Sequence, residues 1–323
     1  MKESRVNEDS LIEAGKEARA QGDIILAASL YKQALEINPD SQKAVKRLGS
    51  TLYAQSDFNA AAEVYRSAIA RLEDRNEVGE VLGNLHLSLG AVFVSLNRLE
   101  EAQEQIARAS QAGADKILLS QSRGNVHLAL EQFDAALIDF EAYTQLDPNS
   151  LDGYLGKAKA YQGKRQHDLA AEALRNAQTL APDNHWVEVA LGNLADDVAD
   201  HPSALEHYQK ALLLKPDSPT VRYNLGAAYL DLEQYAAAKQ MFSEVLKQCP
   251  NDAQSMAGLA RAEEGLGNGR QAIALFKSAI VADPSNISYY AALSHVQVAS
   301  GKVLDAVRTA LRGRKVRLHK QER

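Results

Sequence analysis

Acidic side chains and one imidazole crowd into a short part of this sequence, and together they are the kinds of group that hold metal ions. Asp196, Asp197, Asp200, His201 and Glu206 lie close together along the chain, across an expected turn between two helices. Carboxylate oxygens and an imidazole nitrogen at this spacing can bind a divalent cation.

The same stretch has an ordinary structural explanation. Asp200 is suited to cap the helix that follows it, and Pro202 fits the first turn of that helix. Acidic side chains near a helix N-terminus are also stabilised by the helix dipole. We favour this explanation and predict no metal-binding residues in the chain.

Other sequence patterns that carry chemistry are missing. The chain has no G-x-x-x-x-G-K-[ST] phosphate loop, no G-x-S-x-G nucleophile motif and no H-E-x-x-H metal-binding helix. Its eight histidines are scattered along the sequence. We therefore predict no catalytic residue, no cofactor and no enzymatic activity.

The helices expected to position these side chains follow from a repeat in the sequence. Nine alanines recur along the chain, at intervals of 34 residues except for one interval of 41. A fixed period of this size is typical of a repeat array, in which each unit packs only on its neighbours. The aligned residues are Ala27, Ala61, Ala102, Ala136, Ala170, Ala204, Ala238, Ala272 and Ala306.

The first repeat predicts a pair of helices. Apolar and small residues recur at helical spacing over 11–20 and again over 24–37, with Gly22 and Asp23 between the two stretches and Pro39 after the second. Gly15 and Ala27 are expected where the two helices cross, because a larger side chain there would push the helix axes apart.

This pattern resembles the tetratricopeptide repeat, a 34-residue helix-turn-helix unit. The resemblance rests on a Leu-Gly pair in the first helix (48–49, 89–90, 191–192 and 225–226), an aromatic residue in the second helix, and a closing proline. The aromatic residues are Tyr31, Tyr65, Phe140, Tyr208, Phe242 and Phe276, and the prolines are Pro39, Pro148, Pro182, Pro216, Pro250 and Pro284.

The resemblance implies an all-α, right-handed superhelical solenoid of helix-turn-helix repeats. We predict a leader at 1–7, a single solenoid over 8–320, and a basic C-terminal capping segment over 308–323. The predicted repeats are 8–41, 42–75, 83–116, 117–150, 151–184, 185–218, 219–252, 253–286 and 287–320, with an insertion at 76–82.

Two departures from the pattern affect the expected packing. Seven inserted residues are about two helical turns, so we expect one long first helix over 77–96, an extended second helix in repeat two, or a tolerated loop. Arg123, His127 and Lys157 stand where apolar residues are usual. We expect looser or more polar packing at these positions, with a partner contact as the alternative.

Composition sets limits on localisation and partners. The net charge of −6 disfavours non-specific binding of the whole protein to nucleic acid. No stretch is apolar enough for a membrane span, the first residues lack a signal-peptide pattern, and Cys249 is the single cysteine, so we expect a cytoplasmic protein. The basic segment from Arg308 to Arg323 is expected to be solvated, with an acidic partner, nucleic acid or a membrane surface as the alternative.

In the resembled family the first helices line a concave groove that binds peptides. Carried onto this chain, the groove positions are basic in repeats one and two and more apolar in the middle repeats. We predict these groove residues for partner binding: Lys16, Arg19, Lys43, Lys46, Tyr53, Leu87, Asn125, Leu128, Lys159, Trp186, Val189, Asn193, Tyr223, Leu230 and Arg261. Leu87 and Val189 have packing between first helices as an equal alternative.

The resemblance implies a non-enzymatic scaffold or adaptor that binds a peptide or extended segment of a partner protein, in the assembly of a larger complex such as a pilus, secretion or envelope system. The expected ligand is amphipathic or extended, with acidic residues toward repeats one and two. The alternatives are a holdase-type chaperone, the substrate-recognition module of an enzyme whose catalytic part lies elsewhere, and self-association through the end repeats.

Overall fold

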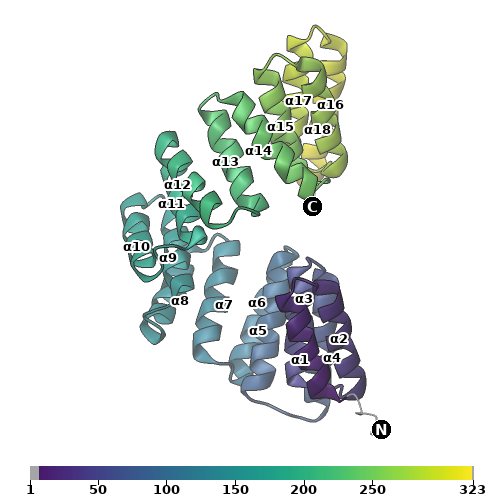
Figure 1. The fold of residues 1–323 in the computed structure, drawn as a ribbon, viewed down its shortest axis with the longest axis vertical. Coiled ribbons are helices and arrows are strands. Elements are labelled where there is room, and N and C mark those ends of the chain that lie inside the picture. The colour runs from purple at the N-terminus through teal and green to yellow at the C-terminus, as the bar shows by residue number, and fades with distance from the viewer. Residues whose placement is uncertain (1–6, 322–323) are drawn as a thin grey trace. The chain divides into compact units, whose positions relative to one another are not determined.

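The computed structural model describes residues 7–321, which form eighteen helices joined by turns and short loops, with no strand (Figure 1). The predicted all-α solenoid is confirmed. The helices are α1 (Glu8–Ala20), α2 (Ile24–Ile37), α3 (Gln42–Ala54), α4 (Phe58–Asp74), α5 (Glu80–Ser95), α6 (Leu99–Ala112), α7 (Lys116–Ala129), α8 (Phe133–Leu146), α9 (Leu151–Gly163), α10 (His167–Leu180), α11 (His185–Asp197), α12 (His201–Leu214), α13 (Pro219–Asp231), α14 (Tyr235–Gln248), α15 (Ala253–Gly265), α16 (Gly269–Ala282), α17 (Ile287–Ala299) and α18 (Val303–Gln321).

Side-chain caps set where the helices begin. The Asn7 side chain accepts the backbone N–H of Ser10, so α1 starts at Glu8 and not at Leu11 as the apolar pattern predicted. The Asp23 side chain accepts the N–H of Leu26 at 2.9 Å and starts α2 at the expected residue. These bonds satisfy backbone donors that have no partner inside the helix.

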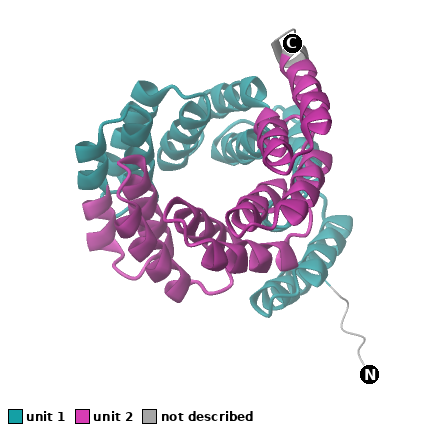
Figure 2. Ribbon diagram, turned by 90° about the horizontal axis from the view of Figure 1, so that it is seen from above, with its two compact units in different colours: residues 1–173 teal, residues 174–323 magenta. Residues whose placement is uncertain are grey.

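The chain divides into two compact units, residues 1–173 and 174–323, with the division inside α10 (Figure 2). Within the first unit each helix from α1 to α9 packs on the next, and α5 also contacts α7. Within the second unit the same succession runs from α11 to α18. The predicted leader lies outside the described residues except for Asn7, and the predicted C-terminal segment continues α18 to Gln321.

The aligned alanines are all buried, and eight of the nine have no exposed surface. A small side chain at this position lets the two helices of a hairpin approach closely. The periodic positions thus mark the helix crossings, which is why the period survives where other signature residues change.

An aromatic ring of the second helix lies directly on a glycine of the first. A Cβ atom added to Gly15 would come within 2.5 Å of Cε1 of Tyr31. Phe242 meets two such glycines, Gly226 of its own hairpin and Gly258 of the next. The ring therefore holds one repeat together and also joins it to its neighbour.

The insertion lengthens two helices and does not form one long helix. Helix α4 has 17 residues against 14 in α2, and α5 has 16 against 13 in α3. Each gains about one turn, and residues 75–79 connect them. The expectation of an extended second helix in repeat two is confirmed, whereas a helix over 77–96 is wrong because the chain bends at Gly79, whose φ of 129° favours glycine.

Two glycines at the same repeat position give a test of this packing. Gly49→Ala should destabilise the protein by about 1–3 kcal/mol, because the new methyl group meets the Tyr65 ring well inside van der Waals contact. Gly90→Ala should be neutral or stabilising by up to about 1 kcal/mol, because Ile106 replaces the aromatic ring and the nearest atoms are 3.5 Å away. Urea denaturation measures both, and equal losses of stability would contradict the close-contact account.

Candidate functional site

A basic groove lies between α1 and α3, which are the first helices of repeats one and two. Lys16 pairs with Glu13 at 2.6 Å, and Lys43 lies 3.8 Å from Asp9. Lys46 and Arg47 have no acidic group within ion-pairing distance among residues 7–321, so this groove keeps unpaired positive charge. Its volume is about 390 Å³, and its lining is Ile12, Lys16, Lys43, Lys46, Arg47 and Ser50.

An apolar pocket continues along the next first helices, α3, α5 and α7. Its volume is about 420 Å³, and it is lined by Gln42, Lys46, Val81, Asn84, Leu85, Leu87, Ser88, Ala91, Leu118 and Ser122. Val81 comes from the turn that the insertion adds to α5, and both Val81 and Leu118 are exposed. Lys46 lines this pocket as well as the basic groove.

The predicted groove residues of the first unit differ in what they offer a ligand. Arg19 donates to the Ser50 hydroxyl at 3.3 Å, and the Tyr53 hydroxyl lies 2.6 Å from that of Ser95. Asn125 and Lys159 are exposed. Leu87 has 4% of its surface exposed and belongs to the core cluster beneath the pocket, and Leu128 is half-buried against a neighbouring cluster.

The second unit contains the other predicted groove residues, and three of them are open to solvent. Trp186 is 50% exposed and its ring lies 4.7 Å from that of His185, and Arg261 is exposed. Tyr223 packs edge-on against Phe242 with part of its surface open. Trp186, Tyr223 and Arg261 thus remain accessible to a partner.

Of the remaining predicted residues of this unit, Val189 and Leu230 are engaged in packing, whereas Asn193 is exposed. Val189 is 6% exposed and lies in a core cluster, so it packs inside the protein and does not contact a partner. Leu230 is half-buried. The side-chain oxygen of Asn193 lies 2.8 Å from the Tyr208 hydroxyl and accepts from Asn224 at 3.3 Å, which leaves it little capacity for a ligand.

Sequence reasoning missed an apolar hollow among α2, α3 and α4. Its volume is about 740 Å³, and Leu35, Leu48, Leu52 and Val64 supply much of the lining, with Lys32, Glu63 and Arg71 at polar positions. Ala28 also lines it, but alanine stands at the same repeat position at Ala62 and Ala171 as well. The sequence therefore carried no specific sign of this hollow.

The polar residues of repeat four pair with a buried carboxylate. Arg123 and His127 of α7 both contact the carboxylate of Asp139 on α8, with His127 Nδ1 2.7 Å from Oδ2. Asp139 is buried. The polar packing expected at Arg123 and His127 is therefore present, and both side chains are held by a neighbour inside the repeat.

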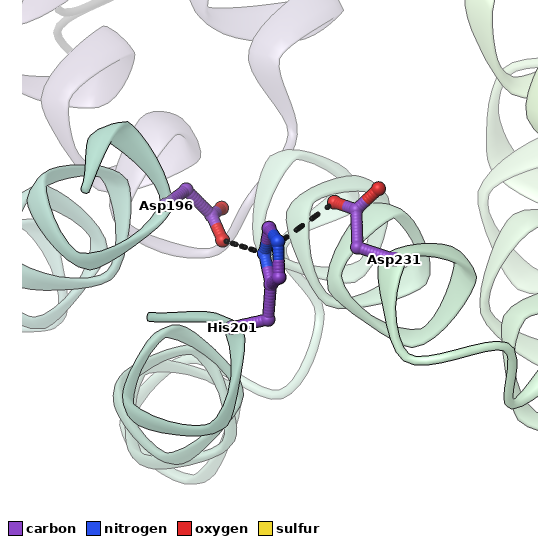
Figure 3. A group of neighbouring side chains, drawn as sticks. All are labelled: Asp196, His201 and Asp231. Atoms are coloured by element: carbon purple, nitrogen blue, oxygen red, sulfur yellow. Dashed lines mark ion pairs between the residues drawn. The ribbon is translucent and has the colours of Figure 1, made fainter. Parts of the chain in front are cut away.

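The acidic stretch near residue 200 contains a cap and a separate cluster. The Asp200 side chain accepts the N–H of Ser203, as expected of a cap for α12. Asp196 and His201 lie beside Asp231, which ends α13 (Figure 3). Asp231 stands 34 residues after Asp197, so the repeat period was the signal that could have placed it next to this stretch.

Three models of the tetratricopeptide repeat match the chain. One, described as a TPR repeat, matches residues 200–232. Two described as tetratricopeptide repeats match residues 18–85 and 230–296, and residues 122–185. Together these matches cover most of the sequence.

Individual proteins match more distantly. The chain is 25% identical over 153 residues to the DnaJ homolog subfamily C member 7 homolog of Schizosaccharomyces pombe, covering 44% of this chain and 32% of that protein. It is 28% identical over 177 residues to the BBSome complex member BBS4 homolog of Drosophila melanogaster, covering 54% and 30%. The chain thus spans about a third of the length of these curated relatives.

A solved structure shares the fold at low identity. The crystal structure of the APC/C hetero-tetramer Cut9-Hcn1 superposes with a TM-score of 0.64 at 20% identity, covering 89% of this chain and 55% of that chain. Among residues 7–321, none of the helices has both the length and the apolar character needed to cross a membrane.

Removing one partner of the buried Asp139 carboxylate gives a stability test. Arg123→Leu should cost about 2 kcal/mol, because it leaves the buried Asp139 carboxylate with a single partner. Arg123→Leu combined with Asp139→Ala should recover much of that loss, since no buried charge remains. Arg108→Leu, which breaks an exposed pair with Glu104, should cost less than about 0.5 kcal/mol. Chemical denaturation compares the three, and no recovery in the double variant would contradict this account.

Proposed function

Because this chain belongs to the tetratricopeptide repeat family, we propose that it is a non-enzymatic scaffold that binds an extended or amphipathic segment of a partner protein along its first helices. The observation that carries the proposal is Lys46, which lines both the basic groove and the apolar pocket. One ligand segment lying over α1, α3, α5 and α7 would contact both.

The basic groove and the apolar pocket favour different ligand chemistry. Unpaired cations at Lys46 and Arg47 favour carboxylates, and opposite charges across an interface raise association rates and fix the register of the ligand. Val81 and Leu118 favour aliphatic or aromatic side chains, and exposed apolar patches with a polar rim often mark binding sites. The proposed ligand therefore carries an acidic stretch followed by an apolar one.

The second unit offers a further contact surface. Trp186 and Tyr223 are aromatic residues with exposed area on first helices, and Trp and Tyr are enriched among residues that dominate binding energy. Arg261 lies on the next first helix. We include these three in the proposed partner surface, described for this unit by itself.

Assembly of a larger complex is the wider part of the proposal. The BBS4 homolog is named as a member of a complex, and Cut9 crystallised in a hetero-tetramer. A scaffold with separate binding surfaces suits such a role. We also propose a cytoplasmic location, since one cysteine, Cys249, gives the chain no internal disulfide to depend on.

A holdase-type chaperone is the second candidate. The apolar hollow among α2, α3 and α4 favours it, because a second open apolar surface suits many unrelated apolar segments better than one dedicated ligand. A dedicated scaffold should select one sequence pattern, whereas a holdase should accept many.

Selection of peptides from a random phage-displayed library tests the scaffold proposal. The enriched peptides should share an acidic stretch followed by aliphatic or aromatic residues. Lys46→Glu should weaken the binding of a selected synthetic peptide at least tenfold, because the substitution reverses the charge where the basic groove meets the apolar pocket. Higher salt should weaken the binding of the same peptide to wild type.

Lys32→Glu is the matched control, since Lys32 lines the apolar hollow among α2, α3 and α4 and neither the basic groove nor the apolar pocket. It should leave peptide affinity unchanged. Loss of binding in Lys32→Glu with none in Lys46→Glu would overturn the proposed site, and enrichment of unrelated apolar peptides with no acidic stretch would favour the holdase. Circular dichroism verifies that both variants fold.

A further inference from the structure

Three side chains with metal-ligand chemistry converge in the second unit. Asp196 lies at the end of α11, His201 at the start of α12 and Asp231 at the end of α13, and they point toward one another (Figure 3). One ligand atom of each lies within 4.8 Å of those of the other two. Asp196 and His201 belong to one repeat and Asp231 to the next.

The distances are longer than those of direct hydrogen bonds. His201 Nδ1 is 3.5 Å from Oδ1 of Asp196 and 3.9 Å from Oδ2 of Asp231. Other histidines of this chain contact carboxylates directly, as in the 2.7 Å contacts of His127 with Asp139 and of His207 with Glu188. The imidazole of His201 is therefore separated from both acids by a gap.

Two atoms that face this gap form no hydrogen bond. Oδ1 of Asp196 and Nδ1 of His201 are shielded from solvent and have no hydrogen-bond partner. Bonds of about 2.0–2.2 Å from zinc to nitrogen and oxygen place neighbouring ligands of a tetrahedral ion roughly 3.4 Å apart. The 3.5 Å separation is close to that value, so one ion would satisfy both atoms.

The charges around the gap also favour a cation. Among residues 7–321, no lysine or arginine forms an ion pair with Asp196 or Asp231, whereas the Asp139 cluster contains Arg123. The ligand oxygens of Asp196 and Asp231 lie within 4.8 Å of each other, so their negative charges repel. A bound cation would offset this repulsion.

Tyr208 orients the most buried of the three ligands. Its hydroxyl donates to Oδ2 of Asp196 at 2.8 Å, which leaves Oδ1 directed at His201. Metal-binding side chains commonly have such a hydrogen bond behind them.

We propose that Asp196, His201 and Asp231 bind a divalent transition-metal ion, with water in the remaining coordination positions. Imidazole nitrogen together with carboxylate oxygen suits Zn²⁺ and its first-row neighbours better than Mg²⁺ or Ca²⁺. The ion would link the α11–α12 turn of one repeat to the end of α13 in the next. This role is separate from partner binding and stabilises the junction between two repeats.

Titration of the whole protein with ZnCl₂ by isothermal calorimetry tests the site. Wild type should bind one equivalent, and Asp231→Asn and His201→Gln should each weaken that binding at least tenfold. Asp217→Asn removes an exposed acid elsewhere in the same unit and should bind as wild type does. MgCl₂ in place of ZnCl₂ should give at least tenfold weaker binding.

Thermal unfolding separates a metal site from a plain ion pair. Zn²⁺ should raise the Tm of wild type and of Asp217→Asn, and should leave the Tm of Asp231→Asn unchanged. The proposal is overturned if Zn²⁺ does not bind wild type, or if all variants bind it equally. It is also overturned if Zn²⁺ binds but raises every Tm alike, because the ion then lies at another site.

Discussion

The seating of an aromatic ring on a helical glycine is the contact on which this solenoid depends. Five of the six aromatic residues at this position of the second helices lie on a glycine of the facing first helix, as in Gly15 with Tyr31 and Gly192 with Tyr208, and Phe276 has Ala260 at the glycine position. Phe140 meets Gly124 and Gly156, which belong to successive first helices. One ring thus fixes the spacing within a hairpin and between hairpins, which leaves the other faces of the helices free to vary.

The candidate binding surface lies where this contact is relaxed. Repeat three has Ile106 in place of the aromatic ring, and the insertion before it lengthens both flanking helices. The added turn of α5 brings Val81 to the apolar pocket, next to Lys46 of the preceding repeat. A departure from the repeat pattern thereby produces a hollow with two kinds of chemistry, and this is the physical basis of the scaffold proposal.

The sequence predicted what depends on local spacing. The aligned alanines, the Gly22–Asp23 turn and the second helix of the first repeat follow from helical periodicity, capping and steric limits. It failed where the outcome depends on neighbours distant in sequence. The bend at Gly79 and the pairing of Asp139 with Arg123 and His127 each require the packed neighbours to be known.

The predicted groove residues show the same limit. A repeat position identifies the helix face, but the size of the neighbouring side chains decides whether a residue there is open, as Trp186 is, or buried, as Leu87 and Val189 are. Asp231 joins Asp196 only through contact between successive repeats, which an examination of one local stretch does not reveal. Comparing residues 34 positions apart in the sequence would have identified Asp231 as a neighbour of this stretch.

Site-specific photocrosslinking of a selected peptide tests the central claim most directly. A photoreactive residue at Ser122 lies in the apolar pocket between the first helices, and one at Ser67 lies in the hollow among α2, α3 and α4. The account predicts crosslinking from position 122 and none from position 67. Crosslinking from position 67 alone, or equally from both, would contradict the claim that the partner segment lies along the first helices.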